Sequence, residues 1–324
     1  KAIKSGFRKH KQALNLLFYE RSNTLERYRL KPYSPHNREK IVEEINKLWN
    51  ECSNQNEAAK IAKTFFKTKV SGKGTDWFPF SKGIQEVENN NISETLNDYI
   101  KDDKNKIISY FTSSEDEFES LGDIWLDQRF QLSQKNIIKE LSSIAIKKNI
   151  LLVIRVHPNV NNASKESKSN WTNIFKELPN KNILIIKETN NISSYSIVNN
   201  SNIVVVYGST IGIEALFLEK PVIVAGSSFY FGTKAKIQPA FKLGDLEKEI
   251  DFLLKNSIVS KENREILKES SYPYGYWMYT NGFKYKYFSP VTPIRGYLLN
   301  FDLQKTHRNL SKLKNTLKGL IFLK

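Results

Sequence analysis

Short apolar runs alternate with amphipathic segments between residues 107 and 224, and this alternation constrains the fold more than any other feature. The runs IISYF, ILLVIRV, NILII, NIVVV and PVIV are almost continuously apolar, and helix-like segments separate them. Strands that are apolar on both faces are typical of parallel sheets covered by helices. The sequence therefore predicts an α/β fold with a doubly wound, Rossmann-like parallel sheet over residues 104–255.

Two further regions flank this predicted domain. Residues 1–103 contain two helix-like segments, at 34–51 and 56–74, and end in a polar stretch at 86–105 that is typical of a linker. Residues 256–324 are rich in aromatic and basic residues. We expect an N-terminal domain at 1–103, lacking some of its strands, and a C-terminal helical segment at 256–324 that returns toward it.

The charge of the chain favours anionic partners. The formal net charge is +16 and the pI is about 9.5, which suits nucleotide phosphates, nucleic acid or an acidic membrane surface. The single cysteine excludes an intramolecular disulfide framework and a multi-cysteine zinc site. No cluster of His, Cys and Asp has the spacing of metal ligands, so we expect no bound metal.

The segment after Asp302 suggests a membrane contact. No acidic residue follows Asp302, and five leucine or isoleucine residues between 310 and 321 recur at helical spacing. A basic amphipathic helix of this kind can lie on an anionic membrane surface. The alternative is a helix packed on the first domain of the same chain.

Polar residues follow four of the predicted strands, at the edge where doubly wound sheets bind their ligands. The strand ends supply Ser113, Ser114, Glu115 and Glu117; Arg155 and His157; Gly208, Ser209, Thr210 and Glu214; and Ser228 and Tyr230. A strand, a Gly-Ser-Thr turn and a helix direct free backbone N–H groups at one point, which suits a phosphate. Neither a P-loop nor a GxGxxG pattern is present.

Each of these candidates also has a structural interpretation. Ser209 and Thr210 are favoured helix N-caps, and the SSEDEF segment fits a cap followed by acidic first-turn residues. Glu214 could hold ribose hydroxyls or complement the N-terminus of its helix. His157, fixed in extended geometry by the following proline, could bind a ligand or serve as a structural hydrogen bonder.

An ordered set of motifs resembles a known family. FYERSNTLERY, FTSSEDEF, LGDIW, RVHPN, ISSYSIV, YGSTIGIEALFLEKPVI and GSSFY occur in the order found in bacterial capsule and surface-polysaccharide biosynthesis proteins, which include the Kdo transferases of capsule assembly. These proteins are similar to GT-B glycosyltransferases, which have two Rossmann-like domains. The resemblance implies that the nucleotide-sugar donor is held by protein groups without a metal or other cofactor.

The resemblance also implies roles for particular residues. The His-Pro motif at His157 and the hydroxyl pair Ser209 and Thr210 would bind the nucleotide phosphate, and Glu214 would bind the ribose. Apart from the resemblance, the positive charge of Arg155 beside His157 would stabilise the charge that develops on the leaving phosphate. Inversion at the sugar would need a carboxylate base, for which Glu20 in FYERS is the candidate; an ion pair with Arg21 or another cation is the alternative.

The predicted function is that of a metal-independent glycosyltransferase of capsular or surface polysaccharide, with a CMP-linked donor as one option and a glycan or glycolipid acceptor. A teichoic-acid-type polyol-phosphate transferase and a sugar-nucleotide epimerase are alternative enzymes. A nucleic-acid-binding protein is the alternative outside enzymes, motivated by the aromatic and lysine-rich segment 272–288; because its basic residues are dispersed along the chain, we expect no nucleic-acid partner. The expected location is the cytoplasm, including the inner face of the cytoplasmic membrane.

Overall fold

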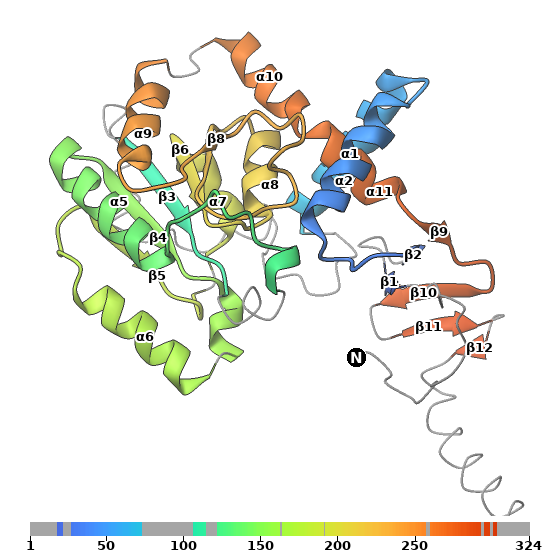
Figure 1. Cartoon of the computed structure of the whole chain (residues 1–324), viewed down its shortest axis with the longest axis horizontal. Coiled ribbons are helices and arrows are strands. Elements are labelled where there is room, and N and C mark those ends of the chain that lie inside the picture. Colours follow the sequence, from blue (N-terminus) through green and yellow to red (C-terminus); the bar gives the residue numbers. More distant parts are fainter. Residues whose placement is uncertain are drawn as a thin grey trace, which may run out of the picture.

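A six-stranded parallel sheet forms the centre of the molecule (Figure 1). The structure is a computed structural model that describes residues 18–21, 27–72, 106–114, 122–162, 164–190, 192–256, 260–292, 295–298 and 301–302. The sheet strands are β3 (Ile107–Phe111), β4 (Leu151–Arg155), β5 (Ile183–Ile186), β6 (Ile203–Val206), β7 (Val222–Val224) and β8 (Gln238–Pro239).

The spatial order of the strands is β5-β4-β3-β6-β7-β8, and every neighbouring pair is parallel. The chain first builds outward from β3 to β5 and then crosses back to build outward from β6 to β8. The reversal makes β3 and β6 neighbours at the topological switch point, where doubly wound sheets bind ligands beyond their carboxyl ends. The predicted α/β class with a doubly wound, Rossmann-like domain is confirmed.

Both faces of the sheet are buried. Along β4, Leu151 and Val153 join one apolar cluster while Leu152 and Ile154 join the other, which explains why the strand sequence is apolar at successive positions. Helices on both faces supply the remaining partners; they are α5 (Gln134–Lys148), α6 (Lys165–Lys176) and α9 (Asp245–Lys255) on one face, and α7 (Ser194–Asn200) and α8 (Ile211–Phe217) on the other.

A further layer of helices packs outside α8. It consists of α1 (Arg38–Asn50), α2 (Gln55–Val70) and α11 (Tyr272–Thr280), and α10 (Lys261–Ser270) leads into α11. Phe66 of α2 stacks on Phe217 of α8 with 4.8 Å between ring centroids. A Cβ atom at Gly275 would lie 2.5 Å from Phe66 Cε2. The absence of a side chain at this position therefore allows α11 to approach α2.

The segment 272–288 accordingly contributes to packing. Tyr272, Tyr274, Trp277 and Met278 are buried in the same cluster as α1 and α2, as expected for a return of the chain to its first part. The predicted boundaries at 103/104 and 255/256 stay a prediction, but the described residues on the two sides of each share this cluster.

Two small antiparallel sheets complete the described structure. One has the order β1-β2-β9 and the other β10-β11-β12. Their bounds are β1 (Phe18–Arg21), β2 (Arg27–Lys31), β9 (Phe283–Lys284), β10 (Phe288–Thr292), β11 (Arg295–Leu298) and β12 (Phe301–Asp302). Two 3-10 helices, η2 (Gly122–Ile124) and η3 (Pro158–Asn162), lie between the main elements.

Three predictions fall outside the described residues. They concern the linker at 86–105, the candidates Glu115 and Glu117, and the C-terminal helix after Asp302. Within the described residues, no helix combines the length and apolar character that crossing a bilayer requires.

Candidate functional site

The carboxyl ends of β3, β4, β6 and β7 bring most of the predicted residues to one edge of the sheet. β3 is hydrogen-bonded to β4 on one side and to β6 on the other. The residues that follow these three strands therefore surround the switch point. The candidate site comprises His157 after β4, Ser113 and Ser114 after β3, and the turn Gly208–Thr210 after β6.

His157 is held at this edge by its own backbone and ring. Its N–H donates to Thr112 Oγ1 at 2.9 Å, and its Nδ1 accepts from the Asn159 N–H at 3.2 Å. Burial, aided by the positive charge of Arg155, lowers the pKa of His157 to about 4. The ring is therefore neutral at pH 7, and with Nδ1 as an acceptor its proton lies on Nε2. His157 can thus donate one neutral hydrogen bond from Nε2.

Arg155 has a different set of partners from the one predicted. It is buried, and its two terminal nitrogens donate to the carbonyl oxygens of Lys187 at 2.5 Å and Asn190 at 3.1 Å. These bonds fasten the connection between β5 and α7. These two bonds use only part of the donor capacity of the guanidinium, and its Nε is buried without a partner. Direct phosphate binding by Arg155 stays a prediction.

The turn Gly208–Thr210 presents one free hydroxyl. Thr210 is the N-cap residue of α8, is exposed, and makes no capping hydrogen bond with its side chain. The backbone of the turn is fixed from below, because Tyr230 donates from its hydroxyl to the Ser209 carbonyl at 2.7 Å. A Cβ atom at Gly212 would lie 2.4 Å from the Tyr230 oxygen. The absence of a side chain at Gly212 therefore allows α8 to pack against Tyr230, which holds the backbone of the turn.

Ser113 contributes a buried hydroxyl with no hydrogen-bond partner. Gln134, the first residue of α5, holds its backbone from both sides: the Ser113 N–H donates to Gln134 Oε1 at 2.8 Å and Gln134 Nε2 donates to the Ser113 carbonyl at 3.0 Å. Ser113 Oγ itself is buried without a partner, and Ser114 is also buried. Buried polar groups are normally paired, so an unpaired hydroxyl next to the switch point marks a place for a polar ligand.

Glu214 is buried, and both of its carboxylate oxygens are engaged. Oε2 accepts from the Tyr195 hydroxyl at 2.8 Å, and Oε1 lies 3.0 Å from Lys69 Nζ. Tyr195 belongs to α7 and Lys69 to α2, so the carboxylate joins three helices. A ribose bound by Glu214 would have to share these partners, and the ribose contact stays a prediction.

The remaining candidates have structural partners or lie apart from the switch point. Ser228 Oγ accepts from the Phe231 N–H at 3.2 Å and Ser228 is fully buried. Tyr230 is buried and serves the turn described above. Glu20 lies in β1, opposite Arg29 of β2, in a different sheet from the strand ends. The structure brings together His157, Ser113, Ser114 and the 208–210 turn, and does not place Glu20 with them.

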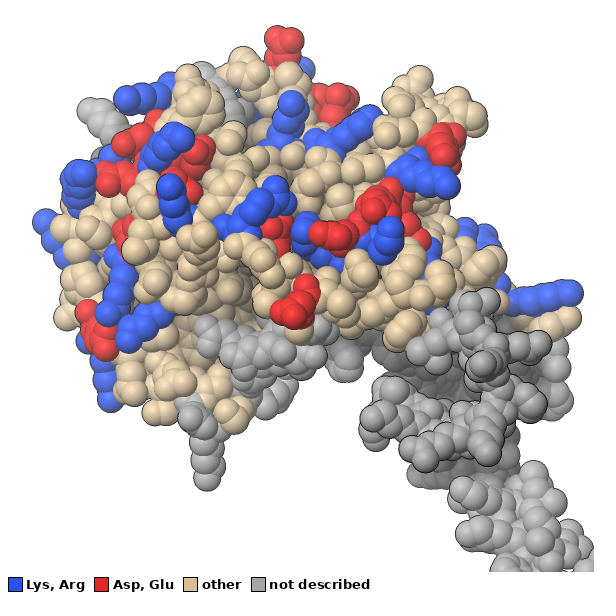
Figure 2. Space-filling view, in the orientation of Figure 1, with Lys and Arg blue, Asp and Glu red and all other residues tan. Residues whose placement is uncertain are grey.

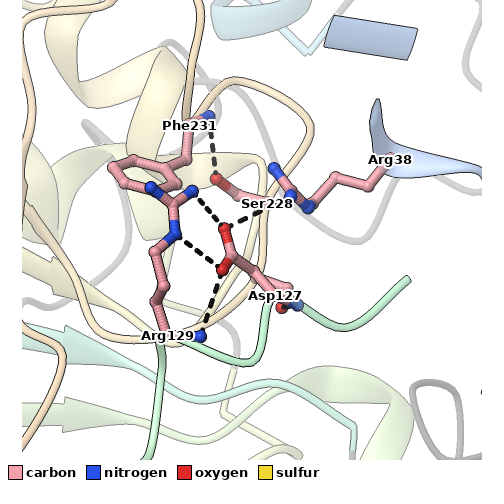
Figure 3. Close-up of polar contacts among 6 residues, drawn as sticks. Arg38, Asp127, Arg129, Ser228 and Phe231 are labelled. Carbon is pink, nitrogen blue, oxygen red and sulfur yellow. Dashed lines mark hydrogen bonds and ion pairs between the residues drawn. The ribbon is translucent and has the colours of Figure 1, made fainter. Parts of the chain in front are cut away.

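The structure adds a buried carboxylate that sequence patterns did not indicate. Asp127 accepts from Arg129 Nε at 2.8 Å and from Arg129 Nη2 at 2.6 Å, and Arg38 Nη2 lies 3.2 Å from the same carboxylate (Figure 3). Its N–H donates to Ser227 Oγ, beyond β7, at 2.7 Å. The hydrogen bonds from Arg129, together with the charge of Arg38, hold the pKa of Asp127 below its usual value.

This cluster fastens α1 to the carboxyl edge of the sheet, because Arg38 is the first residue of α1. The guanidinium of Arg129 also lies over the ring of Phe231, 4.9 Å from its centroid. In the sequence, the only local indication of this cluster is the pair Asp127 and Arg129 in LDQRF. The third partner, Arg38, comes from a distant part of the chain and leaves no local pattern.

No group of three or more His, Cys, Asp or Glu side chains in the described part of the chain is arranged to hold a metal ion. The groups gathered at the switch point can instead form hydrogen bonds: they are the imidazole of His157 and the hydroxyls of Ser113 and Thr210. Such an arrangement can bind the oxygens of an anionic or polyhydroxylated ligand.

One family model matches part of this chain. Residues 98–234 match the model of a family described as capsule polysaccharide biosynthesis protein. This match includes the strand ends of β3, β4, β6 and β7. No curated protein matches the chain.

Several solved structures are similar to this chain. A putative UDP-N-acetylglucosamine 2-epimerase from Listeria monocytogenes has 16% identity and a TM-score of 0.40, over 62% of this chain and 50% of that one. KpsC beta Kdo 2,4 transferase of Thermosulfurimonas dismutans has 13% identity and a TM-score of 0.47, over 78% and 71%. The beta Kdo 2,7 transferase of the same KpsC has 14% identity and a TM-score of 0.42, over 81% and 71%. This chain spans half the length of the Listeria structure.

Proposed function

We propose that this chain, whose residues 98–234 match the model of the capsule polysaccharide biosynthesis family, is a glycosyltransferase. In this proposal it transfers a sugar from a nucleotide-activated donor to a growing capsular or surface polysaccharide. The observation that supports it most directly is the placement of His157, Ser113 and the 208–210 turn at the switch point between β3 and β6. This is the position at which doubly wound sheets bind nucleotides.

The donor phosphates would lie against His157, Ser113 and the turn that ends in Thr210. The pKa of about 4 for His157 makes its ring a neutral donor at pH 7, able to hydrogen-bond a phosphate oxygen without transferring its proton. Hydrogen-bond donors fixed before the reaction stabilise the charge that develops on a leaving phosphate. Because Gln134 and Tyr230 hold the backbones of Ser113 and Ser209, little rearrangement is required when the nucleotide binds.

The proposal includes catalysis without a metal ion, with protein groups neutralising the leaving nucleotide. A carboxylate would deprotonate the acceptor hydroxyl if transfer inverts the sugar, and Glu20 is the first candidate. Glu20→Gln is expected to lower turnover strongly at saturating donor and acceptor. Near-normal turnover of this variant would move the assignment to Glu115 or Glu117.

Charge distribution supports a small anionic ligand over a nucleic acid. Figure 2 shows acidic side chains interspersed with basic ones over the visible face. On the helical surface, Lys147 pairs with Glu247 at 2.7 Å and Lys139 with Glu177 at 3.0 Å. Nucleic-acid-binding proteins instead gather their cations in a patch or stripe.

Thermal unfolding with CMP, UDP, GDP and CDP tests the proposal. A nucleotide at 100 times its dissociation constant stabilises the folded chain by about 2.7 kcal/mol, which corresponds to a rise in Tm of several degrees. We expect one of the four to raise the Tm, and His157→Ala to reduce that rise. The matched control is His36→Ala, since burial lowers the pKa of His36 as well but this residue precedes α1.

Two results would refute the assignment. If none of the four nucleotides raises the Tm of the full chain, the switch point is not a nucleotide site. If His157→Ala and His36→Ala respond to the nucleotide as the wild type does, His157 does not contact the phosphate. Once the nucleotide is known, release of that nucleotide only in the presence of a glycan acceptor distinguishes a transferase from an epimerase.

The proposed location is the cytoplasmic face of the membrane, where a lipid-linked acceptor is accessible. The sequence after Asp302 supplies six lysines and arginines and no acidic residue. Each cation near an anionic bilayer contributes about 1 kcal/mol to binding. Co-sedimentation with phosphatidylserine-containing vesicles should be strong for the full chain and weak for a chain ending at Asn300; equal binding would contradict a membrane role for this segment.

A further inference from the structure

A second candidate binding site lies on the helical layer. A hollow of about 200 Å³ opens between β2, α1 and α11. This volume is below the range of roughly 300–1,000 Å³ typical of drug-sized ligands. The hollow therefore suits a single small ring and is too small for a nucleotide sugar. Its lining consists of Lys31, Glu44, Lys47, Leu48, Glu51, Trp277 and Asn281.

Glu44 organises the polar wall of this hollow. Its Oε1 accepts from Lys31 Nζ and the Tyr33 hydroxyl, and its Oε2 accepts from Trp277 Nε1 at 3.4 Å and Asn281 Nδ2 at 3.3 Å. Burial raises the pKa of Glu44, but the hydrogen bonds from Lys31 and Tyr33 outweigh it and hold the pKa below its usual value. A fixed carboxylate with several donors around it forms a rigid polar surface.

The charges of the lining residues favour a neutral ligand over an anionic one. Two lysines and two glutamates line the hollow, so their charges cancel and a phosphate gains no net attraction. Lys47 and Glu51 are largely exposed and lie 3.9 Å apart, a weak contact that leaves both able to turn toward a ligand. Leu48 adds an apolar wall. Neighbouring donors, acceptors and apolar surface match the hydroxyls and C–H groups of a neutral sugar.

The position of the hollow relative to the strand ends limits its role. On another side of α1, Asn46 Nδ2 donates to the Gly232 carbonyl at 3.0 Å, in the loop that follows β7. A Cβ atom at Gly232 would contact Val42 Cγ1 at 3.3 Å. α1 thus separates the hollow from that loop by about one helix diameter, roughly 10 Å. A sugar in the hollow is therefore too far from the strand ends to be the reacting unit.

We propose that the hollow around Glu44 binds one neutral sugar unit of the acceptor chain, behind the unit that reacts. The proposal rests on the proposed glycosyltransferase function and specifies its acceptor as a chain of more than one sugar. Glu44 positions Lys31, Trp277 and Asn281, while Lys47 and Glu51 close over the bound unit.

The indole N–H of Trp277 offers a direct measurement of binding. The full chain, labelled with ¹⁵N, is titrated with lactose, cellobiose and N,N′-diacetylchitobiose, and with sialyllactose as an acidic probe. The chain has five tryptophans, and Trp277→Phe identifies the signal. We expect at least one neutral disaccharide to shift the Trp277 indole signal in a saturable way.

Three variants locate the binding. Glu44→Gln should weaken it about tenfold, equivalent to one hydrogen bond of about 1.4 kcal/mol. Lys47→Trp, at an exposed position, should block the hollow without disturbing the core. The matched control is Glu43→Gln, because Glu43 is exposed and pairs with Lys40 outside the hollow. It should bind as the wild type does.

The proposal is overturned if no neutral disaccharide shifts the Trp277 signal, if only sialyllactose does, or if Lys47→Trp binds as the wild type does. Stabilisation by a nucleotide is measured on the same variants and should be unchanged by Lys47→Trp. If the wild type binds a nucleotide but no neutral disaccharide, only the proposed sugar site in the hollow is refuted. If the wild type binds no nucleotide, the proposed glycosyltransferase function is refuted.

Discussion

The cluster around Asp127 yields the sharpest prediction for stability. Asp127→Asn keeps the shape of the side chain but removes its charge, leaving Arg38 without a counter-ion. The Arg38 side chain is only 9% exposed and that of Asp127 5%, so water cannot replace the lost interaction. The side chain of Arg129, by contrast, is 59% exposed and can be solvated after its bidentate partner is lost.

The expected cost follows from these exposures. Removing one partner of a buried ion pair destabilises a protein by about 3–5 kcal/mol, whereas an exposed pair contributes about 0–1 kcal/mol. The Arg38 pair therefore dominates. We expect a loss near the lower limit, about 3 kcal/mol, because the asparagine oxygen still accepts one hydrogen bond. For a chain of this size the Tm should fall by about 4 °C.

A double-mutant cycle and a pH series test this reasoning. Arg38→Met combined with Asp127→Asn should cost less than the sum of the two single changes, with a coupling energy of about 1–3 kcal/mol. The pKa of Asp127 is lowered in the folded state, so its contribution is present above about pH 4, the unfolded pKa, and is lost as pH falls through the folded value. The wild type and Asp127→Asn should therefore converge in acid. Additive single effects, or a Tm difference that persists unchanged in acid, would refute the argument.

Three further predictions concern the strand ends and α8. Gly226→Ala should lower the Tm by at least several degrees, because a Cβ atom there would lie 1.7 Å from the Tyr207 carbonyl oxygen; an unchanged Tm would contradict the packing of β6 against β7. Lys69→Met should destabilise the fold by about 2–4 kcal/mol in urea unfolding, since it leaves the buried Glu214 carboxylate without its cation, and adding Glu214→Gln should recover part of the loss. The pKa of His157, about 4, predicts an NMR spectrum of a neutral ring at every pH above about 5.5; a titration near 6.5, the ordinary histidine value, would show that the ring is exposed to solvent.

The sequence predicted the doubly wound domain because its signals are local. Continuous apolar strands and intervening helices are each encoded within a few residues, and a parallel sheet is the arrangement that buries both faces of such strands. The placement of His157 and the 208–210 turn at one edge follows from the same pattern. Their contacts with Thr112 and Tyr230 depend on loop geometry that no periodicity encodes.

The predicted start of the first helix was wrong by a few residues, because a turn precedes the helix and contains a second residue that could serve as its N-cap. The sequence predicted that the first helix begins at Ser34 and Pro35, whereas its N-cap is Asn37, which accepts from the Lys40 N–H at 3.1 Å. The backbone carbonyl of Ser34 instead accepts from the Asn37 N–H at 2.9 Å in the preceding turn. Ser and Asn are comparable caps, so only the chain direction set by packing distinguishes them.

Buried charges could not be predicted because their partners are distant in sequence. Glu214 looked like a free ribose ligand as long as its helix was considered alone. Lys69, which neutralises it, comes from α2, and Tyr195 from α7. Whether a carboxylate is available to a ligand depends on which side chains of other elements pair with it. Those contacts are known only once the fold is known.

The polar ties between the helical layer and the sheet explain how two ligand sites could work together. Arg38 binds Asp127 near the end of β7, and Asn46 binds Gly232 in the loop that follows β7. Both residues lie on α1, whose other side forms the wall of the hollow around Glu44. The helical layer also shares its apolar cluster with the strands and α8. If both proposed sites are used, the distance between the acceptor sugar and the nucleotide would be set by side chains packed in a common core. A helix fixed in this way would act as a spacer between the two.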